Sequence, residues 1–233
     1  MAALIVLATL GSYAVGWIVG VPALVPILNT LASFPFMVLA LRRGRLHLAV
    51  ARMLLWALTM GVCATLASYA RPVQTDTLFL RGESYRIEMF AWVMTGTGAE
   101  STPSVFIPQQ IEHAAAFSAL AVATGGVLAM PMGAVLMNYM AHYVGALAAS
   151  SAHPLLTVAL GWHPWAVIRV ISFVVIGVVL AAPGLARVGG WRNDWRDARP
   201  LLLASAGGLV ADVILKTLFA PQWQQWLLHA VGW

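Results

Sequence analysis

Apolar residues occur along this chain in blocks of about 20, the length that an α-helix needs to cross the roughly 30 Å of hydrocarbon in a bilayer. Hydrophobic residues make up 61% of the sequence and charged residues only 9%, whereas about a quarter of the residues in a soluble domain are charged. So few charges cannot cover a surface that faces water. We therefore expect the bilayer to be the solvent of this protein.

Hydrocarbon offers no hydrogen-bond partners to the backbone, so a chain can cross it only as helices or as a closed barrel. Strands of a barrel alternate apolar and polar residues, and the long apolar runs here show no such alternation. The sequence predicts one all-α domain over residues 1–233, a polytopic bundle of seven transmembrane helices. The predicted spans are 3–19, 22–41, 48–69, 109–130, 132–151, 163–183 and 200–220.

Prolines predict where these helices bend or turn, because proline lacks the N–H that continues a helix. Pro22, Pro26 and Pro35 predict kinks in the second span. Pro131 stands between the fourth and fifth spans, and we expect it to make the turn between them.

Arginine is concentrated in two of the predicted connections, and its distribution predicts the topology. The residues are Arg42, Arg43 and Arg45 after the second span and Arg187, Arg192, Arg196 and Arg199 after the sixth. Under the positive-inside rule both connections face the cytoplasm. The N-terminus is then cytoplasmic, the C-terminus is external, and the long 70–108 connection lies outside. A multi-pass protein of the inner (plasma) membrane is expected.

The formal net charge of +5 could indicate a nucleic-acid partner. The arginines stand at the ends of spans, however, and form no basic patch with interleaved aromatic residues. We interpret them as topology signals, and we expect the bilayer and no nucleic acid as the partner.

The external 70–108 connection is longer than a passive link between helices requires. Residues 80–94 have the composition of a short amphipathic segment that lies on the membrane or caps the bundle. Residues 95–103 follow as a flexible stretch rich in glycine and threonine. We expect this connection to roof a site.

Ionisable and amide side chains inside spans are costly and mark functional sites. Counted at about 1.5 Å per residue from the outer end of each span, nearly all of them lie in the outer half of the bilayer. They are Glu112, His113, Arg169, Asp212 and Lys216, with His153 and His163 at the outer connection between the fifth and sixth spans. His142 is expected near the middle of the fifth span, with Asn138 one turn further in on the same face. An ion conduit needs polar groups on both sides of the midplane, so this asymmetry favours a cavity open to the outside.

We therefore favour a membrane-embedded enzyme or binding protein for a lipid-linked or otherwise amphipathic molecule, which can enter sideways from the outer leaflet. Acid or base chemistry is assigned to Glu112, His113, His142 and Asp212. Substrate binding is assigned to Arg169, Lys216 and Asn138.

A divalent metal such as zinc or copper is a further prediction. His113, His153 and His163 are expected near one surface and offer the imidazole ligands that these metals favour. Their spacing follows no standard metal motif.

Two other functions fit the same residues. In a small transporter or channel, Asp212, Lys216, Arg169 and His142 would form a gate or coupling site. In an accessory subunit, the polar groups would tie the chain to partners.

Purely structural interpretations also stand for single residues. Asp212 could be neutralised by Lys216 one turn away or by Arg169 across a helix interface. Asn138 could join helices by hydrogen bonds.

The topology generates the first testable prediction. Cys63 is the only cysteine, so an Arg42→Cys chain with Cys63→Ala carries one reactive thiol. We expect a membrane-impermeant maleimide to leave it unmodified in intact cells and to modify it after permeabilisation. Labelling of position 42 in intact cells would reverse the topology and move the polar residues to the cytoplasmic half.

Overall fold

The computed structural model describes residues 1–191 and 196–233, and the described chain is all-α, as predicted. Arg192, one of the residues used to predict the topology, lies outside the described residues. The elements are α1 (Ala2–Val19), η1 (Pro22–Leu24), α2 (Val25–Leu31), α3 (Phe34–Arg42), α4 (Leu46–Ala70), α5 (Pro72–Leu78), α6 (Gly82–Thr95), η2 (Ala99–Ser101), α7 (Pro103–Thr124), α8 (Ala129–Ala149), α9 (Pro154–Gly161), α10 (Pro164–Gly189) and α11 (Ala198–Val231).

Within the described residues, five segments are long and apolar enough to cross a membrane: α1, Pro22–Arg42, α4, α10 and α11. The chain is therefore a multi-pass membrane protein by helix length and composition. The helices α7 and α8, with 22 and 21 residues, lie within the same bundle but are outside this set. Both carry polar side chains, such as Gln110 and His142, that lower their hydropathy.

The predicted kinks of the second span are confirmed. The span is divided into η1, α2 and α3, and each of these begins with a proline, Pro22, Pro26 or Pro35, in its first turn. Proline is tolerated there because the first N–H groups of a helix have no intrahelical partner.

The predicted turn at Pro131 is wrong. The chain turns at residues 125–128, where Gly125 and Gly126 have φ values of 59° and 87° that glycine adopts without strain. Pro131 instead lies in the first turn of α8, where its missing N–H costs no hydrogen bond. The helix at the place of the predicted fourth span is α7, which begins at Pro103 and ends at Thr124.

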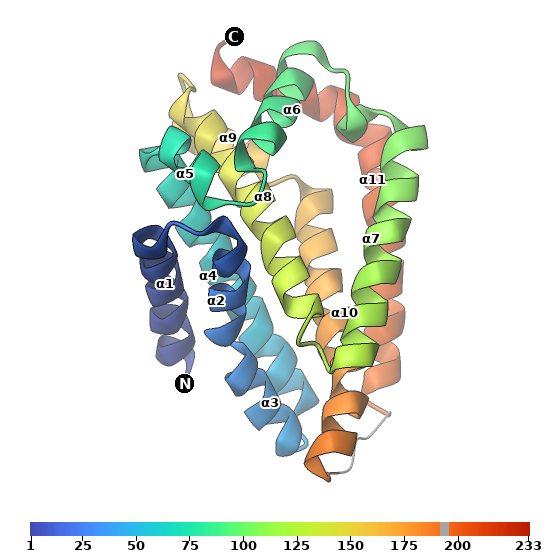
Figure 1. The fold of residues 1–233 in the computed structure, drawn as a ribbon. Coiled ribbons are helices and arrows are strands. Elements are labelled where there is room, and N and C mark those ends of the chain that lie inside the picture. The colour runs from blue at the N-terminus through green and yellow to red at the C-terminus, as the bar shows by residue number, and fades with distance from the viewer. Residues whose placement is uncertain (192–195) are drawn as a thin grey trace.

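Figure 1 shows that the C-terminal ends of α3 and α10, which lead into the two arginine-rich connections, lie at the same end of the bundle, on the side of the N-terminus. The helices α5, α6 and α9 and the C-terminus lie at the opposite end. This agrees with the predicted sharing of one membrane side by the two connections. Their assignment to the cytoplasm stays a prediction.

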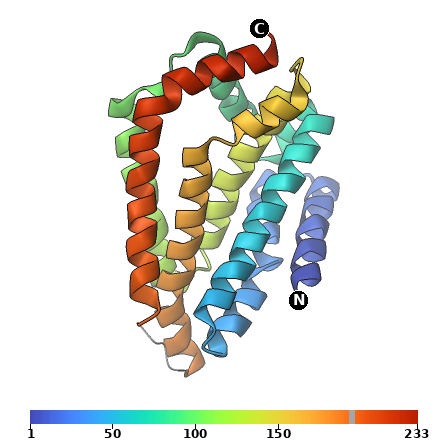
Figure 2. The same cartoon turned by 180° about the vertical axis from the view of Figure 1, so that it is seen from behind.

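The predicted amphipathic segment is a helix, α6, and it caps the bundle. Its Met89, Trp92 and Val93 side chains are buried, and it packs on α8 and α11. The helix α11 bends within its length, and its C-terminal part crosses the same end of the bundle (Figures 1 and 2). Pro221 lies inside this helix. These two elements cover the end of the bundle that carries the site described below.

The helices α4 and α8 cross closely at Gly145. A Cβ atom at this position would overlap the backbone oxygen of Thr65 and lie 2.7 Å from Cβ of Ser68. Because the obstacle is backbone, a side chain here forces the two helices apart.

We expect Gly145→Ala to lower the free energy of unfolding by about 1 to 3 kcal/mol through overpacking. Gly207→Ala on α11 is the matched control, since a Cβ there meets nothing within 4 Å and alanine favours a helix over glycine by about 1 kcal/mol. Thermal denaturation in detergent compares the two variants. Equal stability of both would contradict the close crossing.

Candidate functional site

A cavity of about 450 Å³ lies inside the bundle, within the range of small-molecule sites. Its walls come from α4, α6, η2, α7, α8 and α10, and Lys216 of α11 completes them.

One end of the cavity is polar. Its side chains are Arg81, Ser84, Tyr85, Glu88, Glu100, Gln109, Gln110, His113, Tyr139, Arg169 and Lys216. Among these, Arg81 directly before α6, Ser84 and Glu88 of α6, and Gln109 of α7 are exposed. The mouth of the cavity therefore lies between α6 and the first half of α7, at the end of the bundle that α6 caps.

The other end of the cavity is apolar. Its side chains are Met53, Trp56, Ala57, Met60, Phe117, Met130, Leu136, Met137, Val170, Phe173 and Val174. Phe117 lies about two turns before the end of α7, and Met130 lies in the first turn of α8. The apolar part therefore reaches deep into the bundle, towards the end with the arginine-rich connections.

Asp212 of α11 is fully buried and is neutralised by Arg169 of α10. Nε and Nη2 of Arg169 donate to the two carboxylate oxygens at 2.8 and 2.9 Å, and Gln110 of α7 donates a further hydrogen bond to Oδ2. Of the two structural interpretations of Asp212, the structure shows the pair with Arg169. Such a fork satisfies both oxygens and makes a buried carboxylate tolerable.

Lys216, one turn beyond Asp212, pairs with a residue that the sequence did not single out. Its Nζ lies 2.9 Å from Oε2 of Glu100 in η2 and 4.3 Å from the centroid of the Phe106 ring. Burial alone would raise the pKa of Glu100, but Lys216 and Arg169 outweigh it and hold that pKa below its ordinary value. The 95–103 stretch, expected to be flexible, is thereby fastened to α11.

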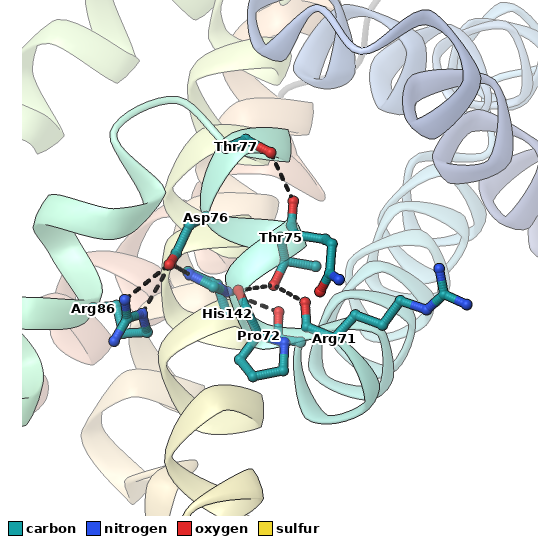
Figure 3. Close-up of polar contacts among 9 residues, drawn as sticks. Arg71, Pro72, Thr75, Asp76, Thr77, Arg86 and His142 are labelled. Carbon is teal, nitrogen blue, oxygen red and sulfur yellow. Dashed lines mark hydrogen bonds and ion pairs between the residues drawn. The ribbon is translucent and has the colours of Figure 1, made fainter.

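A second network joins four elements at the same end of the bundle (Figure 3). Nδ1 of His142 on α8 lies 2.9 Å from Oγ of Ser68 on α4, and its Nε2 lies 2.8 Å from Oδ1 of Asp76 on α5. Arg86 of α6 donates two hydrogen bonds to Asp76, at 2.9 and 2.8 Å. Burial would raise the pKa of Asp76, but the hydrogen bonds from Arg86 and His142 lower it below the ordinary value.

The three side chains Ser68, His142 and Asp76, which contact one another in this order, resemble the components of a nucleophilic triad. Their burial and their position outside the cavity argue for a structural role. Ser68 and His142 are fully buried, and none of the three lines the cavity. A nucleophile must reach its substrate. We interpret this network as the tie that fixes α5 and α6 over α4 and α8.

Asn138 belongs to a third network, away from the cavity. Its Nδ2 donates to Oδ1 of Asn29 at 3.1 Å, and the Tyr13 hydroxyl donates to its Oδ1. These bonds join α8 to α1 and α2, the helix-joining role that the sequence offered as an alternative.

The structure thus divides the residues predicted from the sequence. His113, Arg169 and Lys216 line the cavity, and Asp212 lies directly behind Arg169. His142 and Asn138 lie in the two other networks. Glu112 is exposed on α7 and does not line the cavity.

The three histidines assigned to a metal do not come together. His163 is buried, with its ring stacked on Trp165 at 4.7 Å between centroids, whereas His113 lines the cavity and His153 is exposed. Within residues 1–191 and 196–233, no group of three or more His, Cys, Asp or Glu residues could hold a metal ion. The predicted zinc or copper shell therefore has no support in the described chain.

Sequence reasoning missed the contribution of the 70–108 connection to the lining. Arg81, Tyr85, Glu88 and Glu100 all come from it. The length of the connection was the available sequence signal. It indicated a roof over a site, but it did not indicate which side chains of the connection line the cavity.

Comparisons of the chain with protein-family models, with curated proteins and with solved structures found no match. The function is therefore argued from the site alone.

The buried pair between α10 and α11 generates a prediction. Asp212→Asn leaves Arg169 without its counter-charge, and we expect a loss of roughly 2 to 4 kcal/mol in the free energy of unfolding, moderated because Arg169 is partly exposed to the cavity. Glu112→Gln, at an exposed position of α7, is the control and should change stability by less than about 0.5 kcal/mol.

Denaturation in detergent measures both variants, together with Arg169→Gln/Asp212→Asn. The double variant should recover part of the loss because no lone charge remains. A double variant less stable than Asp212→Asn alone would argue against this explanation.

Proposed function

We propose that this protein binds a lipid-linked or otherwise amphipathic molecule inside the membrane, with the polar head at the mouth of the cavity and the apolar chain in its depth. The observation that carries the proposal is the division of one cavity into a polar and an apolar end. A ligand that matches both ends must itself be amphipathic.

The apolar end is suited to a flexible chain rather than to a rigid molecule. Met53, Met60, Met130 and Met137 contribute to it, and methionine side chains adapt to irregular shapes because they are unbranched and polarizable. Trp56, Phe117 and Phe173 add aromatic surface. Burial of a hydrocarbon chain here contributes about 0.8 kcal/mol per methylene group.

The membrane position follows from the same proposal. We infer that α7 and α8 also cross the bilayer, which gives seven spans, and that the capped end faces outwards in an inner (plasma) membrane. The polar mouth then lies at the level of the outer headgroups. A lipid can reach it without leaving the leaflet.

His113 is the residue we propose for proton transfer to or from the bound head. It lines the cavity and is partly exposed, and it lies one turn from Gln109 and Gln110 on α7. Histidine is the commonest general acid or base at neutral pH. Asp212 and His142, also predicted for this chemistry, are occupied by Arg169 and Asp76.

The transporter hypothesis is less well supported. Its four residues lie in two networks, since His142 contacts Asp76 and Ser68 while Arg169, Asp212 and Lys216 line or support the cavity. The inner end of the cavity is apolar, whereas a path for ions requires polar groups along its length.

Native mass spectrometry of the purified protein tests the binding proposal. We expect the wild type to retain a lipid through detergent exchange, and Leu136→Trp to lose it because the indole fills the apolar part of the cavity. Leu218→Trp is the control, since Leu218 on α11 is exposed and lies outside the cavity. Lipid retained equally by Leu136→Trp would place the binding site elsewhere.

His113→Gln tests the chemistry separately. We expect this variant to retain lipid as the wild type does, while the masses of the retained molecules differ between the two if His113 acts on the head. Identical masses in both would remove His113 from the proposed chemistry and leave binding intact.

A further inference from the structure

Charges of both signs are balanced at the polar end of the cavity. Arg81, Arg169 and Lys216 are positive, and Glu88 and Glu100 are negative. Asp212, paired to Arg169 from behind, brings the two signs to equal number. The polar end therefore has little net attraction for a head that carries a net charge.

The two inner cations are already compensated within the protein. Lys216 is only 2% exposed and pairs with Glu100, and Arg169 pairs with Asp212. A multiply charged anion would have to compete with both carboxylates or lie close to them. Like charges brought together in a site of low dielectric constant cost several kcal/mol, so such a head is disfavoured.

One side of the mouth has the chemistry that binds an ammonium group. The rings of Tyr85 and Tyr139 both line the cavity and stack at 5.0 Å between centroids. Burial, Glu100 and Glu88 raise the pKa of Tyr85, and Arg169 opposes them, so this hydroxyl lies within electrostatic reach of all three charges. Aromatic faces beside carboxylates recognise alkylammonium ions.

Groups that can bind a phosphate line the same polar end of the cavity. Arg169 uses Nε and Nη2 for Asp212, so Nη1 takes no part in that pair, and the side chain is 29% exposed and lines the cavity. Arg81 stands at the mouth with a φ of 52°, an uncommon conformation for a residue other than glycine. Guanidinium groups bind phosphate oxygens by directed hydrogen bonds.

We propose that the lipid bound in this cavity has a zwitterionic phosphodiester head, with the phosphate at Arg169 and Arg81 and the ammonium at Glu88 and Tyr85. This inference rests on the proposed binding of an amphipathic molecule and names its head. A zwitterion supplies one negative and one positive charge, so the net charge of the polar end stays at zero when it binds.

The experiment measures the affinity of purified protein for four lipids with identical acyl chains: phosphatidylcholine, phosphatidylethanolamine, phosphatidylglycerol and diacylglycerol. Tryptophan fluorescence or native mass spectrometry reports binding. We expect the two zwitterionic lipids to bind at least about tenfold more tightly than phosphatidylglycerol, which corresponds to 1.4 kcal/mol, and more tightly than diacylglycerol.

Two variants locate the halves of the site. Glu88→Gln removes a carboxylate that faces the ammonium, so the preference for phosphatidylcholine over phosphatidylglycerol should shrink several-fold. Glu83→Gln is the matched control, since Glu83 is exposed on the same helix and does not line the cavity. Arg81→Gln should weaken the three phospholipids and leave diacylglycerol unchanged.

The outcomes separate this inference from the proposed function. Failure of all four lipids to bind would overturn both. Binding of phosphatidylglycerol or diacylglycerol as tightly as phosphatidylcholine would overturn the zwitterionic head and leave amphipathic binding in place. An unchanged preference in Glu88→Gln would also overturn the assignment of the ammonium side.

Discussion

Hydrocarbon cannot solvate a charge, and this constraint organises the polar residues of the bundle. Asp212 is buried between two long helices and is tolerated because Arg169 and Gln110 satisfy it. Lys216 is tolerated because Glu100 reaches it from the 70–108 connection. Each pair therefore joins elements that are distant in the sequence, and the need to neutralise a buried charge also positions the roof of the cavity.

The roof of the cavity is held by two sets of residues, one outside the cavity and one within its wall. Ser68, His142 and Asp76 fix α5 and α6 from outside the cavity, whereas Glu100 fixes η2 from within its wall. Because the pKa of Asp76 is lower in the folded protein than in the unfolded chain, its contribution to stability is present above the unfolded pKa and is lost as the pH falls through the folded one. The roof is thus held by ionised carboxylates at neutral pH.

Features of this fold that depend on neighbouring residues could be predicted from the sequence, whereas features that depend on packing between distant elements could not. The breaks at Pro22, Pro26 and Pro35 are local, and they were predicted. The turn at 125–128 was misplaced because Pro131 fits equally well inside the first turn of a helix. For the site, counting residues from the ends of the predicted spans placed His113, Arg169 and Lys216 near one end of the bundle. The count could not separate them from His142 and Asn138, whose side chains do not line the cavity.

By itself the sequence determined the solvent, the helical class and the end of the bundle at which most of the polar groups gather, because these follow from composition and from the 1.5 Å rise of a helix. Tertiary structure alone decided the partners: Asp212 with Arg169 rather than with Lys216, and Lys216 with Glu100. The reason is that a helix fixes the spacing of its own residues, whereas the rotation of each helix and the path of a long connection are set by packing against the other elements. The cavity exists only once those rotations are fixed.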